Sequence, residues 1–142
     1  MTTKKQLQAL VIKPEDGRKY PMGRMSAVFK ADLEETESNL SVSEWWLNPD
    51  TEGPHIHKHP EAHLFYVIEG SLSVYLLDKN WFDAQKGTYI YIPGGIAHGF
   101  ENRSSQAVGF MSINTPGGFE ELVPHIVNYF KDNPLGNTNK NN

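Results

Sequence analysis

Four of the six histidines of this chain lie within nine residues, in the stretch GPHIHKHPEAHLFYVIEG. Residues two apart on a β-strand point to the same face of a sheet. His55 and His57 can therefore present two imidazoles to one point, which is what a bound metal ion requires. The stretch predicts a metal site carried by strands, so the remaining sequence must supply a β-sheet framework.

Runs rich in β-branched and aromatic residues recur along the chain and are separated by turn signals. Examples are the NPD stretch at 48–50 and the PGG stretch at 93–95, whose residue types favour turns. Many short strands at regular spacing are typical of a sandwich or a barrel. We expect strands at 25–30, 40–47, 63–68, 72–77, 88–92 and 107–113.

Helical periodicity marks the region near the C-terminus, where large apolar residues from Phe119 to Phe130 follow a 3.6-residue spacing. Pro124 lies inside the pattern, so we expect it to split the helix or to occupy a first-turn position. The length of 142 residues suits one domain. We expect an N-terminal extension at 1–22, either an edge strand or partly ordered, a domain at 23–131 that includes the helix, and a mobile tail at 132–142.

Composition excludes several kinds of site and partner. The chain has no cysteine, so a metal must be held by nitrogen and oxygen ligands. A net charge of -4 without long runs of either sign provides no basic surface for nucleic acid or for a membrane. The sequence lacks a membrane-length apolar stretch and the apolar core of a secretory signal, so we expect a cytoplasmic protein.

A second pattern, GTYIYIPGGIAHGFEN, places Gly87, Pro93, Gly95, His98 and Asn102 at fixed intervals. It resembles the second motif of the cupins, G-x5-P-x-G-x2-H-x3-N, and matches every fixed position. Cupins are small jelly-roll barrels. The resemblance therefore implies an all-β fold, a cupin-type jelly-roll β-barrel with a short C-terminal helix, and it implies that His98 is a metal ligand.

The histidine stretch matches part of the first cupin motif, G-x5-H-x-H-x3–4-E-x6-G. Gly70 closes it, and seven residues earlier His63 stands where the family normally carries a glutamate ligand. The gap from His57 to His63 is one residue longer than the motif allows, whereas the gap from His59 fits. Two registers compete: His55 with His57, or His57 with His59.

We prefer the register of His55 and His57, because the preceding Gly53-Pro54 pair resembles the family's approach to its first histidine. The additional residue would then lie in the turn at 58–62, where insertions are tolerated. Glu61 offers a third register. The predicted ligands of one divalent ion (Fe, Mn, Ni, Cu or Zn) are His55, His57, His63 and His98, with His59 and Glu61 as alternates.

The histidines could instead be structural, since some cupins bind no metal. Neutral imidazoles that face inward without partners would leave buried polar atoms unsatisfied, which favours the metal. Strand alternation places Phe65 and Val67 on the face of His63, and Phe100 on the face of His98. We therefore expect an apolar substrate pocket beside the metal, lined by these three residues.

The stretch at 40–49 and the ending NTPGGFEEL at 114–122 resemble single-domain cupins of the quercetin-dioxygenase type. The resemblance implies a metal-dependent dioxygenase that acts on a small chelating molecule, flavonol-like or diketone-like. Glu61 and Glu69 are candidates for the acid or base, and the catalytic residues are otherwise unassigned. The alternatives are a metal-dependent isomerase, lyase or hydrolase, and a non-catalytic binding protein. Cupins commonly pair, so the resemblance also implies a homodimer.

Overall fold

Alternating burial along the strands shows how the sequence forms its sheets. In strand β3 (Ser41–Leu47) every second residue is buried, so one face of the strand lies on the core. Trp45 is buried and Trp46 is partly exposed, as two adjacent strand residues must be. The structure is a computed structural model, and it describes residues 8–138.

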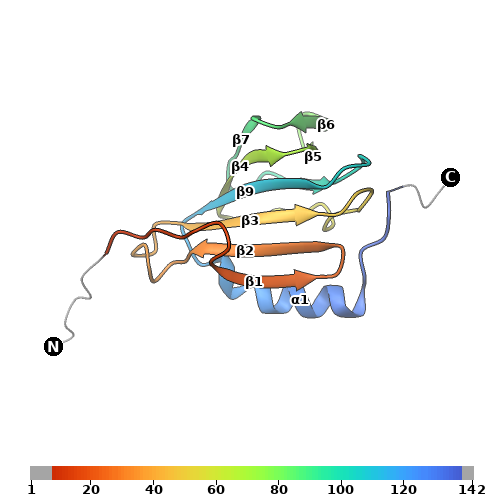
Figure 1. Cartoon of the computed structure of the whole chain (residues 1–142). Helices are drawn as coiled ribbons and strands as arrows, with labels where there is room; N and C mark the ends of the chain where they lie inside the picture. Colours follow the sequence, from red (N-terminus) through yellow and green to blue (C-terminus); the bar gives the residue numbers. More distant parts are fainter. Residues whose placement is uncertain (1–7, 139–142) are drawn as a thin grey trace.

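Within these residues, nine strands form two antiparallel sheets (Figure 1). The larger sheet has the order β1-β2-β3-β9-β4-β7, and the smaller has the order β6-β5-β8. The arrangement confirms the predicted fold class, an all-β jelly roll with one short C-terminal helix. The remaining strands are β1 (Arg18–Met22), β2 (Met25–Ala31), β4 (Ala62–Glu69), β5 (Ser71–Leu76), β6 (Asn80–Gln85), β7 (Tyr89–Ile92), β8 (His98–Glu101) and β9 (Val108–Thr115).

The core lies between the two sheets, and aromatic rings gather at one end of it. The ring of Phe110, from β9, lies 4.9 Å from that of Phe65 and 5.0 Å from that of Phe100. Aliphatic residues such as Val67, Leu72 and Val74 fill the rest. Each large apolar side chain buried here stabilises the fold by about 1.5–3 kcal/mol.

The C-terminal helical segment is divided, as the position of Pro124 predicts. A short 3-10 turn η1 (Phe119–Glu121) precedes helix α1 (Val123–Asp132), and Pro124 lies in the first turn of α1, where no intrahelical N–H is needed. Helix α1 packs against β1, with Val123 and Phe130 buried. No helix among residues 8–138 is both long and apolar enough to cross a membrane.

The strands β6 and β8 were not among the predicted ones. β6 is an edge strand whose buried residues are too few to produce an alternating pattern, and β8 is only four residues long. At the N-terminus, β1 forms the opposite edge of the larger sheet, within the expected extension at 1–22. Residues 1–7 of that extension lie outside the described part of the chain.

The start of the expected tail packs onto the domain. Leu135 is buried, and Gly136 exchanges hydrogen bonds with Glu52: the N–H of Glu52 donates to the carbonyl of Gly136 (3.0 Å), and the N–H of Gly136 donates to Oε1 of Glu52 (3.1 Å). The N–H of Thr138 donates to Oδ1 of Asp50 at 3.1 Å. A single apolar residue and these hydrogen bonds therefore hold 134–138 in place, while residues 139–142 lie outside the described chain.

Candidate metal centre

The first two histidines of the site are paired through their backbones. His57 and His98 form an isolated antiparallel bridge. The N–H of His57 donates to the carbonyl of His98 at 3.0 Å, and the N–H of His98 donates back at 2.9 Å. This bridge fixes the loop at 52–59 to the start of β8, and the two imidazole centroids lie 4.6 Å apart.

His59 completes a group of three. Its ring centroid lies 5.6 Å from that of His57 and 4.9 Å from that of His98. Each residue offers one nitrogen, and the three nitrogens lie within 4.8 Å of one another. Nitrogens that share a metal ion at about 2.1 Å are at most roughly 4.2 Å apart, so small ring rotations bring all three into range.

The three rings are oriented in the same manner, because each Nδ1 lies next to a backbone carbonyl two residues away. The pairs are His57 with His55 (2.7 Å), His59 with Glu61 (2.9 Å) and His98 with Ile96 (2.9 Å). A carbonyl only accepts hydrogen bonds, so each Nδ1 carries the proton and each Nε2 keeps its lone pair. Nε2 of His59 and Nε2 of His98 are buried and find no hydrogen-bond partner among the described residues. A divalent ion would satisfy these atoms, so the residues fit a metal.

His63, at the start of β4, adjoins this group. Its ring centroid lies 4.2 Å from that of His59 and 5.2 Å from that of His98. Its nitrogens also contact β9, where Nδ1 lies 3.3 Å from Oγ of Ser112 and Nδ2 of Asn114 lies 2.9 Å from Nε2. The register of β4 on β9 places His63 opposite Asn114, which explains the contact.

Burial keeps these imidazoles neutral. It lowers the pKa of His63 to about 2 and the pKa of His98 to about 4. It also lowers the pKa of His59, where the hydrogen bond to the Glu61 carbonyl acts in the opposite direction. The neutral imidazole is the form that binds metal, so these residues need lose no proton at neutral pH.

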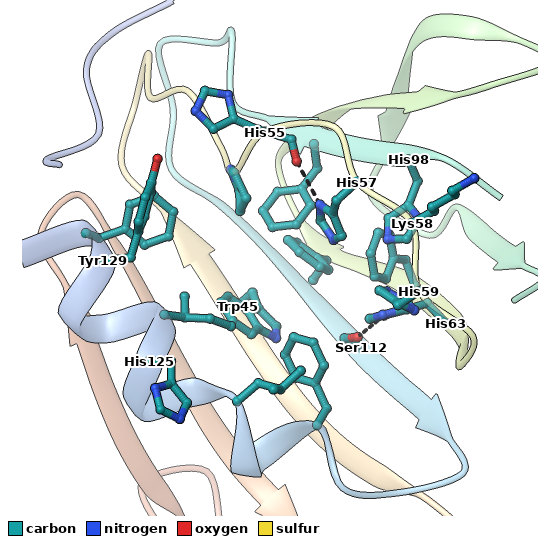
Figure 2. Close-up of a pocket in the computed structure, with 18 residues that line it drawn as sticks. Trp45, His55, His57, Lys58, His59, His63, His98, Ser112, His125 and Tyr129 are labelled. Atoms are coloured by element: carbon teal, nitrogen blue, oxygen red, sulfur yellow. Dashed lines mark hydrogen bonds between the residues drawn. The ribbon is translucent and has the colours of Figure 1, made fainter. Parts of the chain in front are cut away.

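Three of the sequence-predicted residues lie outside the group of His57, His59 and His98. The imidazole of His55 is exposed and turned away from the other histidines (Figure 2), and its backbone carbonyl is what serves the site. Oε2 of Glu61 lies 3.5 Å from Nδ1 of His59, on the side away from the free Nε2. Glu69, at the end of β4, lies 4.0 Å from Nζ of Lys86 and does not approach the histidines.

A cavity of about 510 Å³ extends from the histidines toward α1. Phe65 and Phe100 line it, whereas Val67 is buried in the core and does not. No aspartate or glutamate of the described residues lines this cavity. Its walls are mostly apolar and include Trp45, Phe110, Phe119, Leu122, Ile126 and Phe130.

Sequence reasoning did not assign the outer wall of the cavity or the contacts of His63 to β9. Leu122, His125, Ile126, Tyr129 and Phe130 line the cavity from the helical segment. Their i, i+3, i+4, i+7, i+8 spacing is the signal that identifies this helix face. Ser112 and Asn114 carry no comparable signal, because only the β4–β9 register brings them to His63.

The cupin domain family matches residues 44–114, which is half of the chain, so the chain belongs to the cupin family. No curated protein matches it. Oxalate decarboxylase from Bacillus subtilis, a protein with Mn(II) centres, is similar over 83% of this chain, with a TM-score of 0.69 and 22% identity. A variant of that decarboxylase, in which one tryptophan is replaced by tyrosine, is similar over 84% of this chain, with a TM-score of 0.70 and 21% identity.

This chain spans about a third of those decarboxylase chains, 32% and 33% respectively. An RmlC-like cupin from Shewanella frigidimarina is similar over 85% of this chain and 99% of its own, with a TM-score of 0.64 and 16% identity. At these identities the likenesses establish the shared fold. The cupin fold and the three-histidine group together define a cupin equipped to bind a metal ion.

Proposed function

We propose that this cupin is a metal-dependent dioxygenase that acts on a small, largely apolar molecule carrying two chelating oxygens, flavonol-like or diketone-like. The observation that carries the proposal is the convergence of His57, His59 and His98 on one point at the inner end of an apolar cavity. The cavity volume of about 510 Å³ lies within the usual range for small-molecule sites.

Under this proposal His57, His59 and His98 hold the ion, and His63 is the fourth ligand. His63 is neutral and lies against His59, and it takes the place of the carboxylate that the family normally supplies. Four neutral ligands leave the charge of the ion uncompensated, and an ion so bound would favour an anionic oxygen such as an enolate. His55, the ligand preferred on sequence, is replaced by its alternate His59 in this proposal.

The cavity walls favour the proposed substrate class. Trp45, Phe65 and Phe110 offer ring faces and edges to a flat apolar body. Among residues 8–138 no carboxylate lines the cavity, so no described side chain there repels an ionised chelating oxygen. A small dianion such as oxalate would leave most of the volume unfilled and set its charge against apolar walls, so we do not extend the decarboxylase's substrate to this chain.

One alternative has specific support. The same set of neutral ligands suits an ion that acts as a Lewis acid in an isomerase, lyase or hydrolase. Such a reaction needs no dioxygen, so turnover that is unchanged under anaerobic conditions would favour it. A non-catalytic binding protein would instead hold its ligand after the metal is removed with a chelator.

The test is oxygen uptake by metal-loaded protein with a panel of flavonols and β-diketones, beside elemental analysis. We expect uptake with the wild type and its loss, together with the metal, in His57→Ala and His59→Ala. His125→Ala is the matched control for metal content, because His125 lines the cavity without joining the three-histidine group. Absence of uptake across the panel in fully loaded protein would rule out the dioxygenase.

A further inference from the structure

A second cavity, of about 490 Å³, adjoins the cavity of about 510 Å³ that lies beside the histidines. We call them the polar cavity and the metal-side cavity. Four residues line both: Pro54, His55, Tyr129 and Phe130. The rings of His55 and Tyr129 lie at the end of the metal-side cavity that is away from the three-histidine group (Figure 2). A molecule held at this group by one end can therefore reach the polar cavity with its other end.

The polar cavity differs chemically from the metal-side cavity. The residues that line it alone include Glu52, Trp81, Glu101 and Asn133. It thus has two carboxylates and a carboxamide in its wall, beside one large aromatic ring. An ionised carboxylate only accepts hydrogen bonds, and the bonds it accepts are among the stronger ones. This lining therefore favours a ligand that is rich in hydrogen-bond donors.

Neighbouring groups hold the lining residues in position. Nε of Arg103 donates to Oε1 of Glu101, and the guanidinium lies over the ring of Trp81, 4.3 Å from its centroid. Oε1 of Glu52 accepts a hydrogen bond from the N–H of Gly136 at 3.1 Å. Groups that are already oriented lose little conformational entropy when a ligand binds. Because the guanidinium compensates the charge of Glu101, a neutral hydroxyl fits beside this pair better than a further cation does.

We propose that the polar cavity binds a sugar, so that the substrate is a glycoside whose flat apolar part lies in the metal-side cavity. A sugar ring carries several neutral donors for the carboxylates of Glu52 and Glu101, and its C–H groups pack against Trp81. The volume of about 490 Å³ is adequate for such a ring. The inference rests on the proposed function, because the flavonol-like or diketone-like part supplies the chelating oxygens.

The arrangement of the two cavities also specifies where the sugar is attached. The chelating oxygens must face the three-histidine group, whereas the polar cavity lies beyond His55 and Tyr129. The sugar must therefore be attached on the ring away from the chelating oxygens. A glycoside formed on a chelating oxygen itself would place the sugar at the metal, so it should not bind in this manner.

The experiment measures binding rather than turnover. The protein is loaded with Zn²⁺, which has no redox chemistry, so the ligand is not consumed. Isothermal titration calorimetry compares a flavonol with its glucoside, in which glucose is attached on the ring away from the chelating oxygens. We expect the glucoside to bind about 10-fold more tightly, because the added hydroxyls form charge-assisted hydrogen bonds.

Glu101→Gln tests the lining, because it keeps the shape of the side chain and removes its charge. It should lower the affinity for the glucoside several-fold and leave the affinity for the flavonol unchanged. The matched control is Glu35→Gln. The carboxylate of Glu35 is also paired with an arginine, Arg18 at 2.9 Å, and it lines neither cavity. This control should change neither affinity.

Equal affinities of the wild type for the two ligands overturn the inference and leave the proposed function standing. A Glu101→Gln variant that binds the glucoside as the wild type does, or that loses affinity for both ligands alike, overturns it too. If neither ligand binds the Zn²⁺-loaded protein, the inference and the proposed substrate class both fail. Should Glu101→Gln misfold, Trp81→Ala replaces it, because Trp81 is 36% exposed on the edge strand β6 and its loss should weaken binding of the glucoside alone.

Discussion

The carbonyl oxygen of His55 accepts a hydrogen bond from Nδ1 of His57 at 2.7 Å. His55 thus contributes to the site through its backbone, which fixes the ring of His57 with Nε2 toward the other histidines. Its own imidazole is exposed, so its replacement should not disturb the three-histidine group. His55 and His57 therefore have different roles in the site, although the sequence pattern gives them the same strand parity.

The first prediction follows from that difference. His59→Ala should reduce metal content to less than a tenth of the wild-type value, because it removes one of three converging nitrogens. His55→Ala should leave metal content unchanged, because the carbonyl at position 55 remains. Elemental analysis of the two purified variants measures both. The reverse result would assign the ligands to His55 and His57.

The second prediction concerns the contacts of His63 with β9. Oγ of Ser112 lies 3.3 Å from Nδ1 of His63 and can accept the proton of that nitrogen. Nε2 of His63 then binds a metal once the amide of Asn114, whose Nδ2 lies 2.9 Å from it, turns away. Ser112→Ala should therefore weaken metal affinity about 10-fold, within the usual 10–100-fold effect of such supporting groups. A competition assay with a chromogenic chelator measures it. Ser43→Ala is the control, because Ser43 is buried beside Trp45 and does not contact a histidine in the described structure.

The third prediction gives the last residue of the second motif a structural role. Nδ2 of Asn102 donates to the carbonyls of Asn48 (2.9 Å) and Gln106 (2.7 Å), and its Oδ1 accepts from the N–H of Ser104 at 3.0 Å. The side chain is fully buried. Asn102→Ala should lower the free energy of unfolding by about 2–4 kcal/mol, because it leaves buried polar groups unpaired. Urea denaturation measures this, with the exposed Asn128→Ala as a control that should change little.

The sequence was sufficient for the fold because the second motif and the strand alternation point to the same architecture. Gly87, Pro93 and Asn102 stand at turns or at buried polar positions whose residue types are restrictive, so their spacing is informative. The alternation in β3 fixes which residues face inward. β6 was not predicted because an edge strand faces solvent on much of its surface, so its sequence need not alternate apolar and polar residues.

The site was only partly predictable, and the reason is local geometry. His55, His57 and His59 share the same alternation parity, so periodicity cannot say which two face the cavity. That choice depends on where the chain approaches β8. At Gly53 an added Cβ would lie 1.8 Å from the carbonyl oxygen of Phe100, and this close approach precedes His55. Gly53 and Phe100 are distant in sequence, so a local sequence pattern cannot predict this contact.

The fourth prediction tests the packing of Trp46. Gly109→Ala should lower the melting temperature by several degrees, because the added Cβ would meet the indole ring of Trp46 at 2.5 Å. Gly136→Ala is the matched control, since its added Cβ makes only an ordinary contact, 3.4 Å from Oε1 of Glu52. Thermal unfolding followed by circular dichroism compares them. Equal melting temperatures would show that the indole moves aside at no cost.

The fifth prediction concerns pH and the metal-free protein. In the unfolded chain the imidazoles of His63 and His98 take up protons below about pH 6.5. In the folded chain burial lowers the pKa of His98 to about 4 and that of His63 to about 2. Between pH 6.5 and pH 4 the unfolded state therefore binds more protons than the folded state. The free energy of unfolding must rise with pH through this window, and the contribution is fully present above pH 6.5.

The size of the effect is set by about 1.4 kcal/mol for each pKa unit, so His98 alone accounts for a loss on the order of 3 kcal/mol as the pH falls toward 4. Urea denaturation of chelator-treated protein at several pH values between 4 and 7 measures the slope. His63→Leu should reduce that slope. In this pH range the imidazole of His63 takes up a proton only in the unfolded state, and leucine takes up none in either state. His125→Ala, at an exposed position, should leave it unchanged. A stability that is flat across this range would show that the histidines of the metal-free site are not desolvated.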